Sequence, residues 1–430
     1  MVAESPSARD EMRAGLPAHG TTRLLPPLPK RGFVEHRDWY GELPAGDAAV
    51  MREVERSGLR GKGGARFPTA TKMAAVASRK RGVVVANGTE GEPASQKDIV
   101  LMSHAPHLVL DGALLAAELV GASEVILCLK RGSAVQPIIE RALAERRAYS
   151  YDTIPMTVVG APNRYVSGEE TALVSWLNGG DAKPMFVPPR PFERGVAGRP
   201  TLVQNVETLA DLALIGRYGA DWFRTAGTPE DPGTTLVTLS GAVGAPGVYE
   251  VPLGSRLGDV LRMGKTDCAD LSAVLVGGYF GAWLPASTAG GLTLGVEALK
   301  RAGSGLGAGI IVAMPAKGVC ALEEVTRATR WLADQNAGQC GACVNGLEAI
   351  AEAMETLYAG DRSGNAEQML NRWLGMMEGR GACKHPDGVA RFVASSLRVF
   401  GTEIARHRQQ GPCRVHGAPV LPTPKTGGWR

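Results

Sequence analysis

The chain has 430 residues, 44% of them hydrophobic, and a net charge of +4 that is spread along the sequence. This length allows two to four domains with a sizeable buried core. There is no long basic block, which argues against nucleic acid as a partner. There is also no apolar run of about 18 residues, which argues against a transmembrane segment.

The N-terminal segment is polar and rich in proline, so we expect residues 1–46 to form a flexible arm rather than a signal peptide. The seven cysteines are odd in number, which predicts reduced thiols and a cytoplasmic protein. Cys128 lies in the apolar run EVILCL and is expected in the core. Cys268, Cys320 and Cys413 have no spacing that is typical of metal ligands.

Residues 47–230 alternate short apolar runs with helical stretches. The strand-like runs GVVVANGTEGE, EVILCL and MTVVG are separated by helical patterns over 106–120 and 134–147. This alternation predicts an α/β domain with a mostly parallel sheet of the Rossmann-like kind. Such a domain binds its ligands at the carboxyl ends of the strands.

The composition changes after this domain. Over residues 231–318, short strand-like runs are broken by glycine and proline, which predicts a compact insert of the β-grasp kind. Residues 319–410 contain four helical patterns with apolar faces, which predict a four-helix domain. Residues 411–430 are rich in proline and glycine and are expected to form a poorly ordered tail.

A glycine-rich motif, SGLRGKGGARFPTATKM, precedes a helical pattern and contains Gly58, Gly61, Gly63 and Gly64. Glycines allow the backbone to approach a ligand closely, and N–H groups at the start of a helix suit a phosphate. A flexible loop with a purely structural role explains this motif equally well.

Three further motifs put polar side chains at the end of a strand or the start of a helix. They are VVVANGTEGEPASQKD, RYVSGEETALVSWLNG and GRPTLVQNVETLADL. For an isolated GEE, ordinary capping of a helix by carboxylates is the simpler explanation. The side chains that stand out are Asn87, Thr89, Glu90, Glu92, Glu169, Glu170, Thr201 and Asn205.

Taken together and in this order, the four motifs resemble the NADH-binding flavoprotein subunit of respiratory complex I and its relatives in NAD-linked hydrogenases and formate dehydrogenases. The resemblance runs from about Gly58 to Phe400. It implies an FMN-dependent NAD(P)H dehydrogenase that passes electrons through an iron–sulfur cluster to a ferredoxin or a partner subunit. The oligomeric state stays open. The alternative is a non-enzymatic electron-transfer or scaffold subunit that has lost NADH oxidation.

The resemblance also implies which residues hold FMN and the substrate, NADH or NADPH. No residue would act as an acid or base, because the protein's task is to hold the nicotinamide against the flavin, with Glu92 near the nicotinamide. The cofactor-binding residues would be Gly61, Gly63, Gly64, Phe67, Lys72, Asn87, Glu90, Glu92, Tyr165, Gly168, Glu169, Glu170, Gln204 and Asn205.

The chain departs from the family pattern near the nucleotide. Thr89 stands where the family typically has Asp, and Ala75 occupies a position that is often aromatic. In FVPPRP, Val187 and Arg190 replace a Lys and a Phe that clasp the nucleotide. These departures predict weaker nucleotide binding than in relatives that keep the Lys and the Phe.

Three cysteines match the family's cluster motif, CxxCxxC followed by a distant Cys. Cys340 and Cys343 lie in DQNAGQCGACVNG, Cys383 lies in GRGACKHPDG, and the first position of the motif is Ala337. A standard site with four thiolates is therefore excluded. The remaining interpretations are a [3Fe–4S] cluster, a zinc site with His385, three thiols without a cluster, or a [4Fe–4S] cluster whose fourth iron binds Asp334, Asn336, His385 or water.

Overall fold

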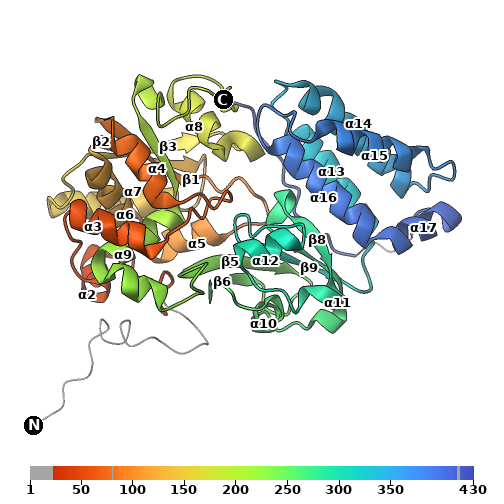
Figure 1. The fold of residues 1–430 in the computed structure, drawn as a ribbon, viewed down its shortest axis with the longest axis horizontal. Coiled ribbons are helices and arrows are strands. Elements are labelled where there is room, and N and C mark those ends of the chain that lie inside the picture. The colour runs from red at the N-terminus through yellow and green to blue at the C-terminus, as the bar shows by residue number, and fades with distance from the viewer. Residues whose placement is uncertain (1–22, 80, 414–416) are drawn as a thin grey trace, which may run out of the picture.

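The computed structural model describes residues 23–79, 81–413 and 417–430. Figure 1 shows three parts: a parallel sheet with its helices on the left, a second sheet below the centre, and the C-terminal helices on the right.

The first sheet is parallel throughout, as predicted. Its strands are β1 (Gly82–Gly88), β2 (Ala122–Lys130), β3 (Met156–Ala161) and β4 (Thr201–Asn205), in the spatial order β3-β2-β1-β4. Because β2 and β4 lie on opposite sides of β1, the chain reverses its direction of winding there. A crevice opens at such a point, at the carboxyl ends of the strands, and this is where Asn87 of β1 pairs with Asn205 of β4.

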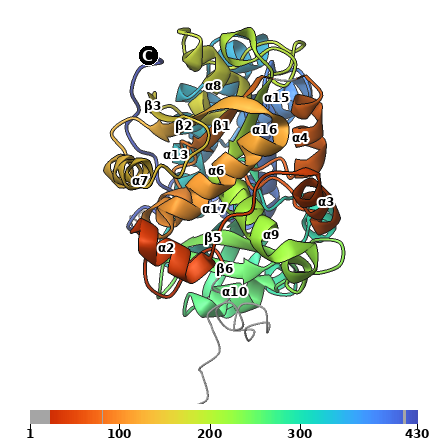
Figure 2. The ribbon, with the colours of Figure 1, turned by 90° about the vertical axis from the view of Figure 1, so that its left-hand side faces the viewer.

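Helices cover both faces of this sheet. α6 (Pro106–Val120) is buried almost all round because it packs against β1 and β2 and against α9 (Val206–Arg224). Figure 2 shows α6 in front of the sheet with α9 beside it. Among the described residues no single helix is long and apolar enough to cross a membrane, although α5 and α6, bent by 98°, pass as a pair by length and composition. The helices of this domain are α3 (Ala48–Ser57), α4 (Thr69–Ala77), α5 (Lys97–His104), α6 (Pro106–Val120), α7 (Gln136–Ala148), α8 (Glu170–Leu177) and α9 (Val206–Arg224).

One local prediction next to this domain was wrong. Helix α2 (Phe33–Tyr40) lies inside the segment predicted as a flexible arm, and the part of that arm before residue 23 lies outside the described residues. The helix is anchored because Phe33, His36 and Tyr40 are buried, and His36 Nε2 lies 2.7 Å from Asp111 Oδ2. The run Thr201–Asn205 leads into helix α9, as predicted, and is itself strand β4, which the sequence analysis did not identify.

The second sheet is mixed, with the order β6-β5-β9-β7-β8. β5 and β9 are parallel, and the other neighbours are antiparallel. The short strand β8 was not anticipated from the sequence. The elements are β5 (Thr234–Gly241), β6 (Gly247–Pro252), α10 (Leu257–Met263), β7 (Leu271–Val276), β8 (Ala282–Pro285), α11 (Ala286–Ala289), α12 (Val296–Arg301) and β9 (Ile310–Pro315).

The C-terminal part is helical, and a π-helical turn over Ala342–Leu347 leads into α14. The chain after α17 was expected to be poorly ordered, yet Leu421 is fully buried and Trp429 O accepts a hydrogen bond from Ala182 N at 3.1 Å. The end of the chain therefore returns to the parallel-sheet domain. The helices are α13 (Ala321–Asp334), α14 (Glu348–Tyr358), α15 (Asn365–Met377), α16 (His385–Val399) and α17 (Gly401–Gln410).

Candidate cofactor cleft and cluster site

A cleft of about 670 Å³ opens at the carboxyl ends of β1 and β4 and is closed on its other sides by loops of the second sheet and the start of α16. Each of the cofactor-binding positions implied by the sequence resemblance lines this cleft. They are Gly61, Gly63, Gly64, Phe67, Lys72, Asn87, Glu90, Glu92, Tyr165, Gly168, Glu169, Glu170, Gln204 and Asn205.

The glycine-rich loop is held in place by its own backbone and by α9. Gly61 N donates to Phe67 O at 2.9 Å, and Lys62 N donates to Thr208 Oγ1 at 2.8 Å. Gly64 has a φ of +116°, which favours glycine, and no atom lies within 4 Å of the position that a Cβ would occupy. The loop thus leaves an open cradle in front of Gly64.

The loop after β1 is fixed to the GEE turn. Asn87 Nδ2 donates to Gly168 O at 2.8 Å, and Thr89 Oγ1 donates to Asn87 Oδ1 at 2.8 Å. A Cβ on Gly168 would lie 2.5 Å from Thr89 Oγ1, so only glycine fits at this position. Thr89 therefore orients the amide of Asn87 in the place of the family's Asp.

Glu90 and Glu92 differ in how completely their carboxylates are paired. Glu90 accepts hydrogen bonds from Asp98 N and Ile99 N, both at 3.0 Å, and from Ser95 Oγ at 2.6 Å, so it caps α5. Glu92 Oε2 accepts from Tyr165 Oη at 2.6 Å, but its Oε1 is buried without a partner among the described residues. Burial raises the pKa of each carboxyl to about 7, and Asp98 adds to the shift of Glu90.

The GEE turn and the start of α9 use their side chains partly as helix caps. Glu169 accepts from Thr171 N at 2.9 Å and from Ala172 N at 3.0 Å, and Asn205 Oδ1 accepts from Glu207 N at 3.0 Å. The capping explanation of an isolated GEE thus holds for Glu169. Glu170 instead pairs with Lys72, whose Nζ lies 2.5 Å from its carboxylate.

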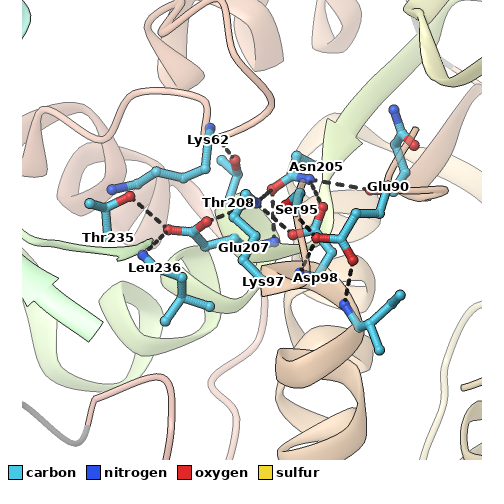
Figure 3. A network of polar contacts seen from close by, with 12 residues as sticks. Lys62, Glu90, Ser95, Lys97, Asp98, Asn205, Glu207, Thr208, Thr235 and Leu236 are labelled. Carbon is cyan, nitrogen blue, oxygen red and sulfur yellow. Dashed lines mark hydrogen bonds and ion pairs between the residues drawn. The ribbon is translucent and has the colours of Figure 1, made fainter. Parts of the chain in front are cut away.

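A buried ion network lies beneath the cleft, and sequence reasoning missed it (Figure 3). Lys97 Nζ lies 2.6 Å from Asp98 Oδ1 and 2.9 Å from Glu207 Oε2. Glu207 Oε1 in turn accepts from Leu236 N at 2.9 Å, which joins α9 to the second sheet. Lys97 and Asp98 end the strand-end motif and Glu207 is the Glu of NVETL, but nothing in the sequence pairs these distant residues.

The residues that the resemblance places along the nucleotide are more exposed than those of the cleft. Phe67 lines the cleft with 52% of its surface exposed. Val187 and Arg190 are exposed and lie outside the described cleft lining. The predicted weakness of nucleotide binding stays a prediction.

The three cluster cysteines lie close together. Cys343 is buried, and burial followed by the neighbouring sulfurs of Cys340 and Cys383 raises the pKa of its thiol to about 12. Burial also acts on Cys340, but backbone N–H groups from Ala382 and Cys343 outweigh it and hold its pKa below the usual value. Three thiolates at this spacing repel one another unless a cation lies between them, which is the environment of an iron–sulfur cluster.

Ala337, the first position of the cluster motif, is buried, and its backbone N–H points to the sulfur of Cys343. Among the protein groups considered for the fourth iron, Asn336 Nδ2 already donates to Ala333 O at 2.6 Å. His385 Nε2 lies 2.9 Å from Leu332 O, while its Nδ1 is buried without a partner among the described residues. Burial lowers the pKa of His385 to about 4, so the ring is neutral.

The residues of the cleft fit a bound flavin mononucleotide. The open cradle at Gly64 suits a phosphate, and the unpaired Glu92 Oε1 and Arg66 Nε are buried polar atoms that lack a partner within the described chain. The three cysteines fit an iron–sulfur cluster with one iron that no cysteine binds.

Two family models match the chain. The Nuo51 FMN-binding domain covers residues 54–214, and the NADH-ubiquinone oxidoreductase-F iron-sulfur binding region covers residues 323–407. The NADH-quinone oxidoreductase F 2 subunit of Rhizobium meliloti is 32% identical over 387 residues, which cover 85% of this chain and 90% of the relative. The corresponding F subunit of Mycobacterium tuberculosis (strain H37Rv) is 33% identical over 390 residues, or 85% of each chain.

A solved structure agrees with these relatives. The chain is similar to the NAD+-reducing [NiFe]-hydrogenase in the air-oxidized state, with a TM-score of 0.80, 29% identity, and coverage of 97% of this chain and 69% of that chain. These similarities confirm the predicted NADH oxidation, FMN and iron–sulfur cluster. The chain belongs to the family of NADH-oxidising flavoprotein subunits that bind FMN and pass electrons through an iron–sulfur cluster.

Proposed function

We propose that the chain oxidises NADH at the cleft between β1 and β4 and passes the electrons through its three-cysteine cluster to a ferredoxin or a partner subunit. One observation carries this proposal. Cys383 lines the same cleft as Gly64 and Asn87, so one of the three cluster cysteines forms part of the wall of the flavin site. FMN, when bound, supplies the conversion of a hydride into single electrons.

The glycine-rich loop and the start of α9 would hold the phosphate end of the flavin. Gly63 and Gly64 offer backbone N–H groups, and Gln204 and Asn205 line the same cleft. Arg66 lines the same cleft and carries a positive charge, and its buried Nε has no partner within the described chain. This arrangement supports binding of an anion without a Walker loop.

The strand-end loop and the GEE turn would hold the ring system and the nucleotide. Asn87 and Glu90 would face the flavin ring, with Gly168 leaving room beside them. Glu92 would lie near the nicotinamide, where the hydrogen bond from Tyr165 fixes one oxygen and leaves the other free. Lys72, Glu169, Glu170 and Phe67 would lie along the bound nucleotide.

Cys340, Cys343 and Cys383 would bind three irons, and the fourth iron would bind His385 Nδ1, Asp334 or water. His385 keeps a neutral ring with one nitrogen unpaired, whereas the side chain of Asn336 is already engaged. Metal-bound histidines commonly donate their other ring nitrogen to a carbonyl, as Nε2 does here to Leu332 O.

We further propose that residues 231–318 form a β-grasp domain and that residues 319–410 form a four-helix iron–sulfur domain, with the FMN domain over 47–230. The mixed sheet with α10 and the packing of α13, α14, α15 and α16 support these boundaries. The odd cysteine count supports a cytoplasmic location.

An anaerobic titration tests the proposed function. In the chain reconstituted with FMN and its cluster, NADH should bleach the flavin absorption band. The reduced protein should then reduce an added ferredoxin. A chain that binds FMN but is not reduced by NADH or NADPH would instead support a non-enzymatic electron-transfer subunit. Parallel titrations with the two nucleotides give the substrate preference.

A further inference from the structure

Four metal-binding side chains meet at a second place in the helical part, away from the cluster cysteines. Cys320 lies at the start of α13, Glu403 and His407 lie on α17, and Cys413 follows α17. One ligand atom of each lies within 4.8 Å of every other. Cys320 and His407 are buried, whereas Glu403 and Cys413 are half-buried.

His407 is oriented as a metal ligand. Its Nδ1 lies 2.8 Å from Tyr358 O, so this nitrogen donates a hydrogen bond to the carbonyl. The proton is thereby fixed on Nδ1, and the lone pair of Nε2 points toward Cys320 Sγ at 3.5 Å. A carbonyl that accepts from the second ring nitrogen is the usual support for a metal-bound histidine.

The spacing also suits a tetrahedral ion. With a Zn–S bond of about 2.3 Å and a Zn–N bond of about 2.0–2.1 Å, tetrahedral geometry separates sulfur and nitrogen by about 3.5 Å. The observed distance between Cys320 Sγ and His407 Nε2 is 3.5 Å. A thiol that donates to the imidazole would have a similar separation, so the other two groups decide the interpretation.

We propose that this cluster binds one zinc ion through Cys320 Sγ, Cys413 Sγ, His407 Nε2 and a carboxylate oxygen of Glu403. Two sulfurs and an imidazole select zinc over magnesium or calcium, which prefer oxygen ligands. Glu403 Oε1 lies 3.5 Å from Leu322 N and also 3.5 Å from Arg406, and the Glu403 carboxylate hydrogen-bonds with the Cys320 thiol. Binding would release the protons of the two thiols.

This site is separate from the flavin and the cluster cysteines. Cys320 precedes the 14 residues of α13, and Cys340 follows them. At 1.5 Å per residue, α13 puts roughly 20 Å between the two sites. Four protein ligands leave no open position, so the zinc would be structural and would fasten α17 and the following chain to the start of α13.

The test is metal analysis of the full chain purified with its flavin and cluster. We expect about one zinc per chain in addition to iron, and zinc K-edge X-ray absorption that reports two sulfurs and two nitrogen or oxygen neighbours. This measurement needs no variant and therefore stands even if a substitution unfolds the domain. A chain without zinc, iron in place of zinc at this site, or a Cys320–Cys413 disulfide in anaerobic protein would each overturn the proposal.

Variants separate this zinc from metal at the cluster site. Cys413→Ser should lose most of the zinc and keep its iron and FMN, whereas Cys343→Ser should lose iron and keep the zinc. Cys268→Ser is the matched control, because Cys268 is a half-buried cysteine outside both sites, and it should keep both metals. Zinc that disappears with Cys343→Ser but not with Cys413→Ser would contradict the assignment.

Discussion

The flavin cleft and the cluster site share a wall, but the chain stabilises them in different ways. In the cleft, Asn87, Glu90 and Lys97 are held by hydrogen bonds and ion pairs within the protein. At the cluster, three sulfurs lie close together with backbone N–H groups as their partners. The cleft is therefore shaped before its cofactor binds, whereas the cluster site depends on iron to hold its thiolates together.

Loss of one cluster ligand should have the largest effect. Cys343→Ser removes a buried thiol that interacts with the other two sulfurs, so we expect loss of nearly all cluster iron and of electron transfer to an added acceptor. The flavin content should be unchanged, because the cleft is held by its own polar network. Iron analysis measures the cluster content, and release of flavin from the denatured protein measures the FMN content. Loss of both cofactors together would show that the cleft depends on the cluster, contrary to this account.

The converse variant should empty the cleft and spare the cluster. Gly64→Val puts a β-branched side chain at a φ of +116° and into the open cradle, so FMN should bind at least about a hundredfold more weakly. Gly121→Val is the matched control, since Gly121 also has a positive φ and open space but lies after α6. Flavin titration should weaken only in the Gly64 variant, and retained affinity would mean that the loop does not contact FMN.

The exposed loop that contains Val187 and Arg190 should bind NADH more tightly when the Lys and Phe of the family are restored there. A Val187→Lys, Arg190→Phe double variant adds a charge-assisted contact, so the KM for NADH should fall by about tenfold. The measurement is steady-state oxidation of NADH and NADPH by both proteins. An unchanged KM would show that this loop does not close on the nucleotide.

A fourth thiol should make the iron–sulfur cluster more stable in air. Ala337→Cys puts a sulfur beside Cys343, because the N–H of Ala337 already points to that sulfur. We expect the cluster to survive exposure to air several times longer. The decay of the cluster absorption in air measures this lifetime. An unchanged lifetime would mean that residue 337 does not reach the cluster or that no cluster forms.

The smallest effect concerns pH. The carboxyls of Glu90 and Glu92 have pKa values of about 7 in the folded chain because they are buried, whereas in the unfolded chain they are about 4.3. The folded state therefore binds more protons between these values, and its stability falls as pH rises from about 4.5 to about 7. Flavin-free protein should melt several degrees higher near pH 5 than near pH 8, and Glu92→Gln should reduce the difference. A melting temperature that rises with pH would contradict this.

Local patterns and the resemblance together predicted most of the cleft. The strand that ends in Asn87 and the GEE turn are each recognisable from a few adjacent residues. The resemblance supplied the order of these motifs along the chain. The sequence could not indicate the ion pair of Lys97 with Glu207, because those residues are far apart and only the fold joins them. For the same reason Cys320 and Cys413 had no recognisable spacing. Helix α2 was missed because its surroundings are rich in proline and polar residues, while its burial depends on contacts with α6 and α7.

The most direct test of the account is an anaerobic titration of the reconstituted chain with NADH, followed by absorption and electron paramagnetic resonance together. We predict that NADH bleaches the flavin band and that a signal from a reduced iron–sulfur cluster appears in the same titration, since Cys383 lines the flavin cleft. In the Cys343→Ser variant the flavin should still bleach, but the cluster signal should be absent. Bleaching of the flavin without any cluster signal in the unaltered chain would contradict the proposed electron path.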